Sequence, residues 1–215
     1  MRALLAVALV VVACGTQASD RPAPPAPPPL AYQRGALFVD ADSALRFAAC
    51  GTTAEVMVTD APDARLREAV QAVNGALRDS LFIEFLADTT QGRVVVRDAL
   101  FATSLVEGSR CDQPRPPFLW VAVGVEPFWR VTYDGSQMVI ERPEPPRELV
   151  FDAKPAEVRG TLTTISGTRA LGKVHDLKLG LLRETCRDGM SSAWYPYRAE
   201  VRVGDEALAG CARRW

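Results

Sequence analysis

Histidine is almost absent from this sequence, which has one such residue, His175, among 215. A single histidine cannot build a histidine-rich metal site, and it argues against histidine-based catalysis. Cysteine pairs spaced C-x-x-C, the usual start of zinc and dithiol redox motifs, are missing too. So are the G-x-S-x-G, H-E-x-x-H and P-loop patterns. The sequence therefore predicts a protein that is not an enzyme and holds no metal and no cofactor.

An excess of charge of one sign is also missing. The chain has 25 Lys and Arg against 26 Asp and Glu, a formal net charge of −1. Such a chain has no overall attraction for phosphate backbones. No cluster of basic and aromatic side chains of the kind that binds single strands stands out either. We expect no nucleic-acid partner.

Hydrophobic runs long enough to cross a membrane are the third absence. A spanning helix needs about 20 apolar residues, whereas the apolar run Ala3–Ala13 has eleven. Arg2 places a positive charge directly before the run. Charge and run length together are typical of a secretion signal, so we expect residues 1–13 to be a signal peptide.

The apolar run ends in the residues VVAC, which resemble the lipobox of bacterial lipoproteins. The resemblance implies that Cys14 carries the lipid anchor and that the chain is cut before it. An ordinary signal peptide with a chance cysteine is the alternative. Gly15 and Thr16 follow the cysteine, whereas Asp at this place is typical of retention at the inner membrane in the lipoproteins that the motif resembles. The expected location is therefore the outer membrane, with the chain facing the periplasm.

Residues 14–31 are expected to form a tether behind the lipidated cysteine. Six prolines fall between Pro22 and Pro29. Proline-rich segments favour polyproline II and act as semi-rigid spacers of about 3.1 Å per residue. A PxxP ligand for a recognition domain is the alternative interpretation, and the spacer is the one we favour.

The odd number of cysteines becomes even once the lipid takes one. Cys50, Cys111, Cys186 and Cys211 remain. In an oxidising compartment four cysteines indicate two disulfides, with three connectivities open. Pairing Cys50 with Cys111 and Cys186 with Cys211 keeps each bond within one half of the chain. The lone histidine and the cysteine spacing make metal ligation the weaker alternative.

Residues 32–122 are predicted to form a small five-stranded barrel with one helix. Asp60 is the expected helix cap, with Pro62 and Asp63 in the first turn and Asn74-Gly75 as the stop. One apolar helix face would consist of Leu66, Ala69, Val70 and Val73. The expected strands are 35–39, 45–49, 55–58, 81–86 and 93–101.

The same residues resemble the C-terminal OB-like domain of NlpE-type envelope lipoproteins. The pattern "RG…F…D…F..C", then a helix, then LFIEFL and GRVVV, carries the resemblance, through Arg34, Gly35, Phe38, Ala44, Leu45, Phe47, Cys50 and Gly51. It implies an OB-like fold and a role in surface sensing or envelope-stress signalling. The copper-linked part of that family has a C-x-x-C motif, which is lacking here.

Residues 123–215 are predicted to form a second, small antiparallel β domain, because short strand patterns alternate with turn residues. An Asp134-Gly135 turn would join the first two strands. Leu177, Leu179 and Leu181 indicate a half-buried strand. The expected strands are 130–133, 137–141, 147–152, 158–165, 177–182, 199–203 and 207–211.

This second half also resembles an uncharacterised bacterial envelope domain with the pattern EPFW … CxDGMS … YP … GC. Related domains occur beside lysozyme-inhibitor-like modules. Phe128 and Trp129 are expected in the core, and Arg213, Arg214 and Trp215 are expected to form a frayed end. We assign a candidate binding rim to Glu126, Trp129, Asp188, Met190 and Ser191.

The predicted function is therefore a periplasmic lipoprotein that binds an unidentified envelope protein or ligand, in a sensing or envelope-stress role. An inhibitor of a lysozyme-like enzyme is the first alternative. A hydrolase using carboxylates such as Glu126, Glu141 and Asp188 is the second. Ser166 with His175 has no catalytic motif around it, and His175 and Asp176 would point to opposite faces of a strand.

Overall fold

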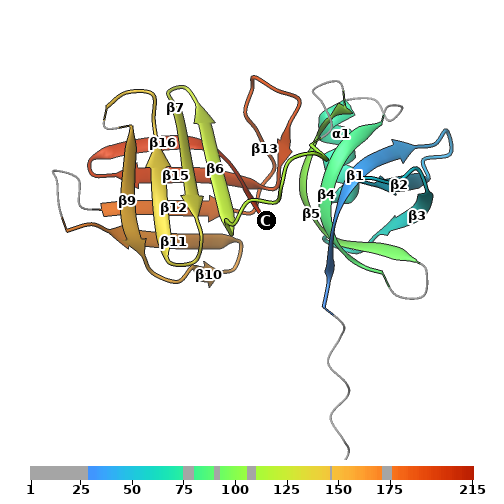
Figure 1. Cartoon of the computed structure of the whole chain (residues 1–215), viewed down its shortest axis with the longest axis horizontal. Coiled ribbons are helices and arrows are strands. Elements are labelled where there is room, and N and C mark those ends of the chain that lie inside the picture. The colour runs from blue at the N-terminus through green and yellow to red at the C-terminus, as the bar shows by residue number, and fades with distance from the viewer. Residues whose placement is uncertain (1–28, 75–79, 90–92, 106–109, 146, 171–175) are drawn as a thin grey trace, which may run out of the picture.

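The computed structural model describes residues 29–74, 80–89, 93–105, 110–145, 147–170 and 176–215. The described chain is mainly β and forms two barrels that lie side by side (Figure 1). This confirms the predicted fold class. Cys14, the expected signal peptide, most of the tether and His175 lie outside the described residues.

The first barrel has five strands and closes on itself. Its order is β5-β3-β2-β1-β4, and β4 pairs back onto β5. Neighbouring strands are antiparallel, except that β3 runs parallel to β5. With one helix between β3 and β4, the barrel is OB-like, as expected. The strands are β1 (Ala31–Val39), β2 (Leu45–Ala49), β3 (Glu55–Asp60), β4 (Leu81–Asp88) and β5 (Val94–Ser104).

Helix α1 (Leu66–Asn74) begins later than the sequence predicts. Pro62 and Asp63 lie in a turn before it, and both Asp63 and Arg65 have a φ of 64°. Asp60 still caps the helix from the end of β3, because its carboxylate accepts hydrogen bonds from the backbone N–H groups of Leu66 and Arg67 at 3.4 and 3.1 Å. In the described part of the chain, no helix is long and apolar enough to cross a membrane.

The second barrel has eight antiparallel strands. Its order is β11-β12-β15-β16-β6-β7-β8-β9, and β9 pairs back onto β11. Alternate side chains point into its core, as in β12, where Leu177, Leu179 and Leu181 are buried. The strands are β6 (Trp120–Val125), β7 (Phe128–Tyr133), β8 (Gln137–Glu141), β9 (Glu148–Ala153), β11 (Leu162–Thr168), β12 (Asp176–Leu182), β15 (Tyr197–Val203) and β16 (Glu206–Arg214).

The second half differs from the sequence prediction in one strand and in where the two halves divide. The expected strand 158–165 is a hairpin, since Gly160 has a φ of 60° and turns β10 (Glu157–Arg159) back onto β11. The expected division at residue 122 falls inside β6, all of which belongs to the second sheet.

A short hairpin from the second half joins the sheet of the first barrel. It consists of β13 (Cys186–Arg187) and β14 (Trp194–Tyr195), and Trp194 pairs with Ala102 on β5. In Figure 1 this hairpin lies between the two barrels. The two halves of the sequence are therefore interlocked, with one short segment crossing from the second to the first.

The disulfides are Cys50–Cys111 and Cys186–Cys211, the pairing favoured from the sequence. The second bond joins the crossing hairpin to β16 of the second barrel. Its partners are 25 residues apart.

Replacing Cys186 and Cys211 together with alanine is expected to lower the free energy of unfolding by about 2–4 kcal/mol, since the bond restricts the unfolded chain. Urea denaturation followed by circular dichroism measures this. Reduction of the double variant, which keeps Cys50–Cys111, serves as a control because it should add a further, separate loss. An unchanged unfolding midpoint in the double variant would contradict the expectation.

Candidate functional site

Two cavities lie next to each other along the outer face of β6. One has a volume of about 420 Å³ and the other about 410 Å³. Val123 lines both, so they are neighbours. We call the first the acidic pocket and the second the arginine pocket, after their linings, and the pair the crevice.

The acidic pocket brings together two of the five predicted rim residues. Glu126 and Asp188 both line it, although they are 62 positions apart in sequence. Glu126 follows the end of β6, and Asp188 follows β13. The other three rim residues are not in its lining, which consists of residues 123–126, 184–188, Arg198 and residues 209–211.

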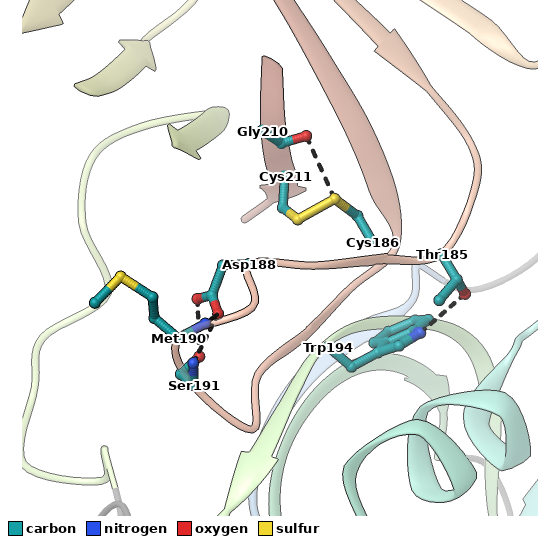
Figure 2. The surroundings of a disulfide bond; sticks show 8 residues. All are labelled: Thr185, Cys186, Asp188, Met190, Ser191, Trp194, Gly210 and Cys211. Atoms are coloured by element: carbon teal, nitrogen blue, oxygen red, sulfur yellow. Dashed lines mark hydrogen bonds between the residues drawn. A yellow bond between two sulfur atoms is a disulfide. The ribbon is translucent and has the colours of Figure 1, made fainter. Parts of the chain in front are cut away.

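Asp188 organises its own loop. Its carboxylate accepts hydrogen bonds from the N–H groups of Met190 and Ser191 at 3.0 and 2.8 Å, and from the Ser191 hydroxyl at 2.8 Å. Figure 2 shows these contacts beside the Cys186–Cys211 bond. Met190 is 67% exposed and points away from the disulfide (Figure 2). Asp188 and Ser191 therefore shape the loop that presents Met190 to solvent.

Trp129 belongs to the core of the second barrel rather than to a rim. It is 4% exposed, whereas Phe128, also expected in the core, is 55% exposed. The Trp129 ring passes so close to Gly124 that a Cβ there would lie 2.1 Å from its Nε1 atom. No hydrogen-bond acceptor for this Nε1–H is found among the described residues. Trp129 thus packs beneath the acidic pocket. A residue larger than glycine at position 124 would disturb this packing.

The charged lining of the acidic pocket is mixed. It contains three acidic residues and two arginines, which are Glu126, Glu184, Asp188, Arg187 and Arg198. Over the part of the chain that the structure describes, no group of three or more His, Cys, Asp or Glu side chains is placed to hold a metal ion. Of the other residues considered for catalysis, Ser166 lies on β11 and Glu141 lies 3.6 Å from Arg130. The structure does not bring Glu141 into this pocket.

The crossing hairpin is held against the first barrel by Trp194. Its side chain is fully buried among core residues of that barrel. Its Nε1–H donates to the Thr185 hydroxyl at 3.1 Å, and the Arg65 guanidinium lies 5.3 Å from the ring centroid. Figure 2 shows Trp194 on the opposite side of the segment from Met190. This contact fixes one wall of the crevice.

Ion pairs cross between the barrels beside this segment. Asp98 on β5 lies 3.2 Å from Arg183 and accepts a hydrogen bond from Arg214 Nε at 3.0 Å. Glu84 on β4, which is 1% exposed, lies 2.9 Å from Arg213 on β16. The expectation of a frayed end is wrong for these residues, because Arg213 and Arg214 each pair with an acid of the other barrel.

The arginine pocket adjoins these ion pairs, because Arg213 is one of its lining residues. Its lining consists of Arg110, Gln113, Pro114, Pro116, Val121, Val123, Arg130, Tyr195, Arg213 and Trp215. Burial lowers the pKa of Arg213, and its attraction to Glu84 opposes that change, while Arg110 lowers the pKa further. The sequence did not predict this pocket, because its residues come from β6, β7, β14, β16, the last residue of the chain and the connection between the barrels.

A scan against protein-family models, a search of curated proteins and a search of solved structures each found no match to this chain. The resemblances to NlpE-type lipoproteins and to the envelope domain therefore stay predictions.

Proposed function

We propose that this protein is a lipid-anchored lipoprotein of the bacterial outer membrane that binds an envelope component in the crevice along β6, without catalysing a reaction. The observation that carries the proposal is the crevice itself. Two cavities of about 420 and 410 Å³ adjoin, and the charged side chains that line them come from the second half of the sequence, except for Arg110. Cavities of this size suit small ligands or the side chains of a partner protein.

Separate features support the proposed location in the cell envelope. Two disulfides are in keeping with an oxidising compartment. The lipobox-like VVAC and the proline-rich segment precede the first barrel directly. A lipid anchor and spacer of this kind would hold the barrels away from the membrane surface.

The anchor is tested by changing Cys14 to serine. We expect the variant to move from the membrane fraction to the soluble periplasmic fraction, because no thiol remains to receive the lipid. Fractionation of osmotically shocked cells with immunoblotting measures this. A Cys50→Ser variant, which also lacks one thiol, is the matched control and should stay in the membrane fraction. A membrane-bound Cys14→Ser variant would contradict the lipid anchor.

Binding in the crevice is tested by photo-crosslinking in living cells. A photoreactive amino acid at position 126, in place of Glu126 in the acidic pocket, is expected to give a discrete adduct. The same group in place of Arg159, whose side chain is 83% exposed on β10, is the control and should give none. Equal adducts at both positions, or none at position 126, would contradict the proposal. A lysozyme-like enzyme in the adduct would identify the inhibitor role.

A further inference from the structure

The arginine pocket has a strongly one-sided charge. Arg110, Arg130 and Arg213 line its cavity of about 410 Å³, and no acidic side chain is among the lining residues that the structure describes. Glu84 neutralises part of the charge of Arg213. Arg130 lies 3.6 Å from Glu141, but both side chains are nearly half exposed, so water and salt weaken that pair. The cavity therefore has more positive than negative charge near its surface.

The cations are held in fixed positions by aromatic rings. The Arg213 guanidinium carbon lies 3.6 Å from the Trp215 ring centroid and 4.3 Å from that of Phe101. The Arg110 guanidinium carbon lies 4.9 Å from the Phe101 centroid. Stacked guanidinium groups keep their N–H edges available for in-plane hydrogen bonds. A planar oxyanion is the group that such edges recognise best.

Apart from Gln113, the rest of the lining is apolar or aromatic. Tyr195, Pro114 and Pro116 supply apolar surface next to the arginines. The ring of Trp215, stacked on Arg213, also contributes to the lining. The pocket thus offers positive charge and apolar walls together.

We propose that the arginine pocket binds a small organic anion, in which a carboxylate or phosphate group is attached to an apolar group. Arg110 and Arg130 hold the oxyanion, and Tyr195 and Trp215 pack against the apolar group. The inference deepens the proposed function, on which it rests, by naming the ligand class of one half of the crevice. Because both arginines are partly exposed, the affinity falls as the salt concentration rises.

The test uses the purified, detergent-solubilised full chain and isothermal titration calorimetry. The probes are phenyl phosphate and benzoate, with phenol as the neutral analogue. We expect saturable binding of at least one anion and none of phenol. Tighter binding of phenyl phosphate assigns a phosphate ligand, and tighter binding of benzoate assigns a carboxylate. Failure of both anions to bind, or equal binding of phenol, would overturn the inference.

Arginine variants place the binding in this pocket. Arg110→Gln and Arg130→Gln are each expected to lower the affinity for the anion about tenfold, because each removes a charge-assisted contact. Arg202→Gln, which removes an exposed arginine of β15 outside the pocket, should bind like the parent chain. Thermal unfolding checks that the variants fold. Unchanged affinity in both pocket variants would overturn the inference, whereas the crosslink at position 126 tests the proposed function independently.

Discussion

Replacing Arg213 with methionine is expected to lower the free energy of unfolding by about 3–5 kcal/mol. The variant leaves the carboxylate of Glu84, which is 1% exposed, without the guanidinium that lies 2.9 Å away. Methionine keeps an unbranched apolar side chain against the neighbouring rings, so the lost charge pairing dominates the effect. Urea denaturation monitored by circular dichroism gives the difference.

A double variant distinguishes the loss of the ion pair from the cost of leaving one buried charge unpaired. Glu84→Leu combined with Arg213→Met removes both charges, and we expect it to recover most of the stability lost in Arg213→Met. Arg202→Met, at an exposed position of β15, is the matched control and should change stability by less than about 0.5 kcal/mol. A loss in Arg213→Met no larger than in this control would show that the pair contributes nothing.

The first barrel could be predicted because its signals are local. The strand LFIEFL, the apolar face of the helix and the spacing of Cys50 and Cys111 each act within a short stretch or one half of the chain. Glu84 in the middle of LFIEFL was a further signal. A carboxylate inside an apolar strand needs a basic partner when it is buried. The sequence does not say which of its arginines that partner is.

The alternation of side chains along a strand could have corrected the expectation that Phe128 and Trp129 both lie in the core. Trp129 has the same parity as Val131 and Tyr133 along β7, and all three point into the second barrel. Phe128 has the opposite parity and points to solvent. Expecting both aromatic residues in the core ignored the alternation that a strand imposes.

The crossing hairpin could not be predicted from sequence patterns. Strands β13 and β14 have two residues each, too short for any hydrophobic period to be recognised. The core that buries Trp194 is built by residues at least 92 positions earlier, from Leu37 to Ala102. For the same reason the crevice was missed, except for the pairing of Glu126 with Asp188 in a common rim.

Replacing Trp194 with alanine is expected to lower the stability of the first barrel by about 3–5 kcal/mol, although the residue belongs to the second half of the sequence. The side chain is fully buried in the core of that barrel, and its loss leaves a cavity beside helix α1 and strand β5. The Thr185 hydroxyl loses its donor as well. Hydrogen exchange of the α1 and β5 amides, together with urea denaturation, measures where the loss falls.

Trp129→Ala is the matched control, because it removes the same side chain from the core of the second barrel. Trp194→Ala should speed exchange mainly in α1 and β5, and Trp129→Ala mainly in β6 and β7. Trp194→Phe, which keeps an aromatic ring, should recover much of the stability that alanine loses. If Trp194→Ala lowered stability by less than about 1 kcal/mol, the hairpin would rest on the first barrel without being part of its core. The fixed wall of the crevice would then depend on the Cys186–Cys211 bond and the ion pairs of Asp98.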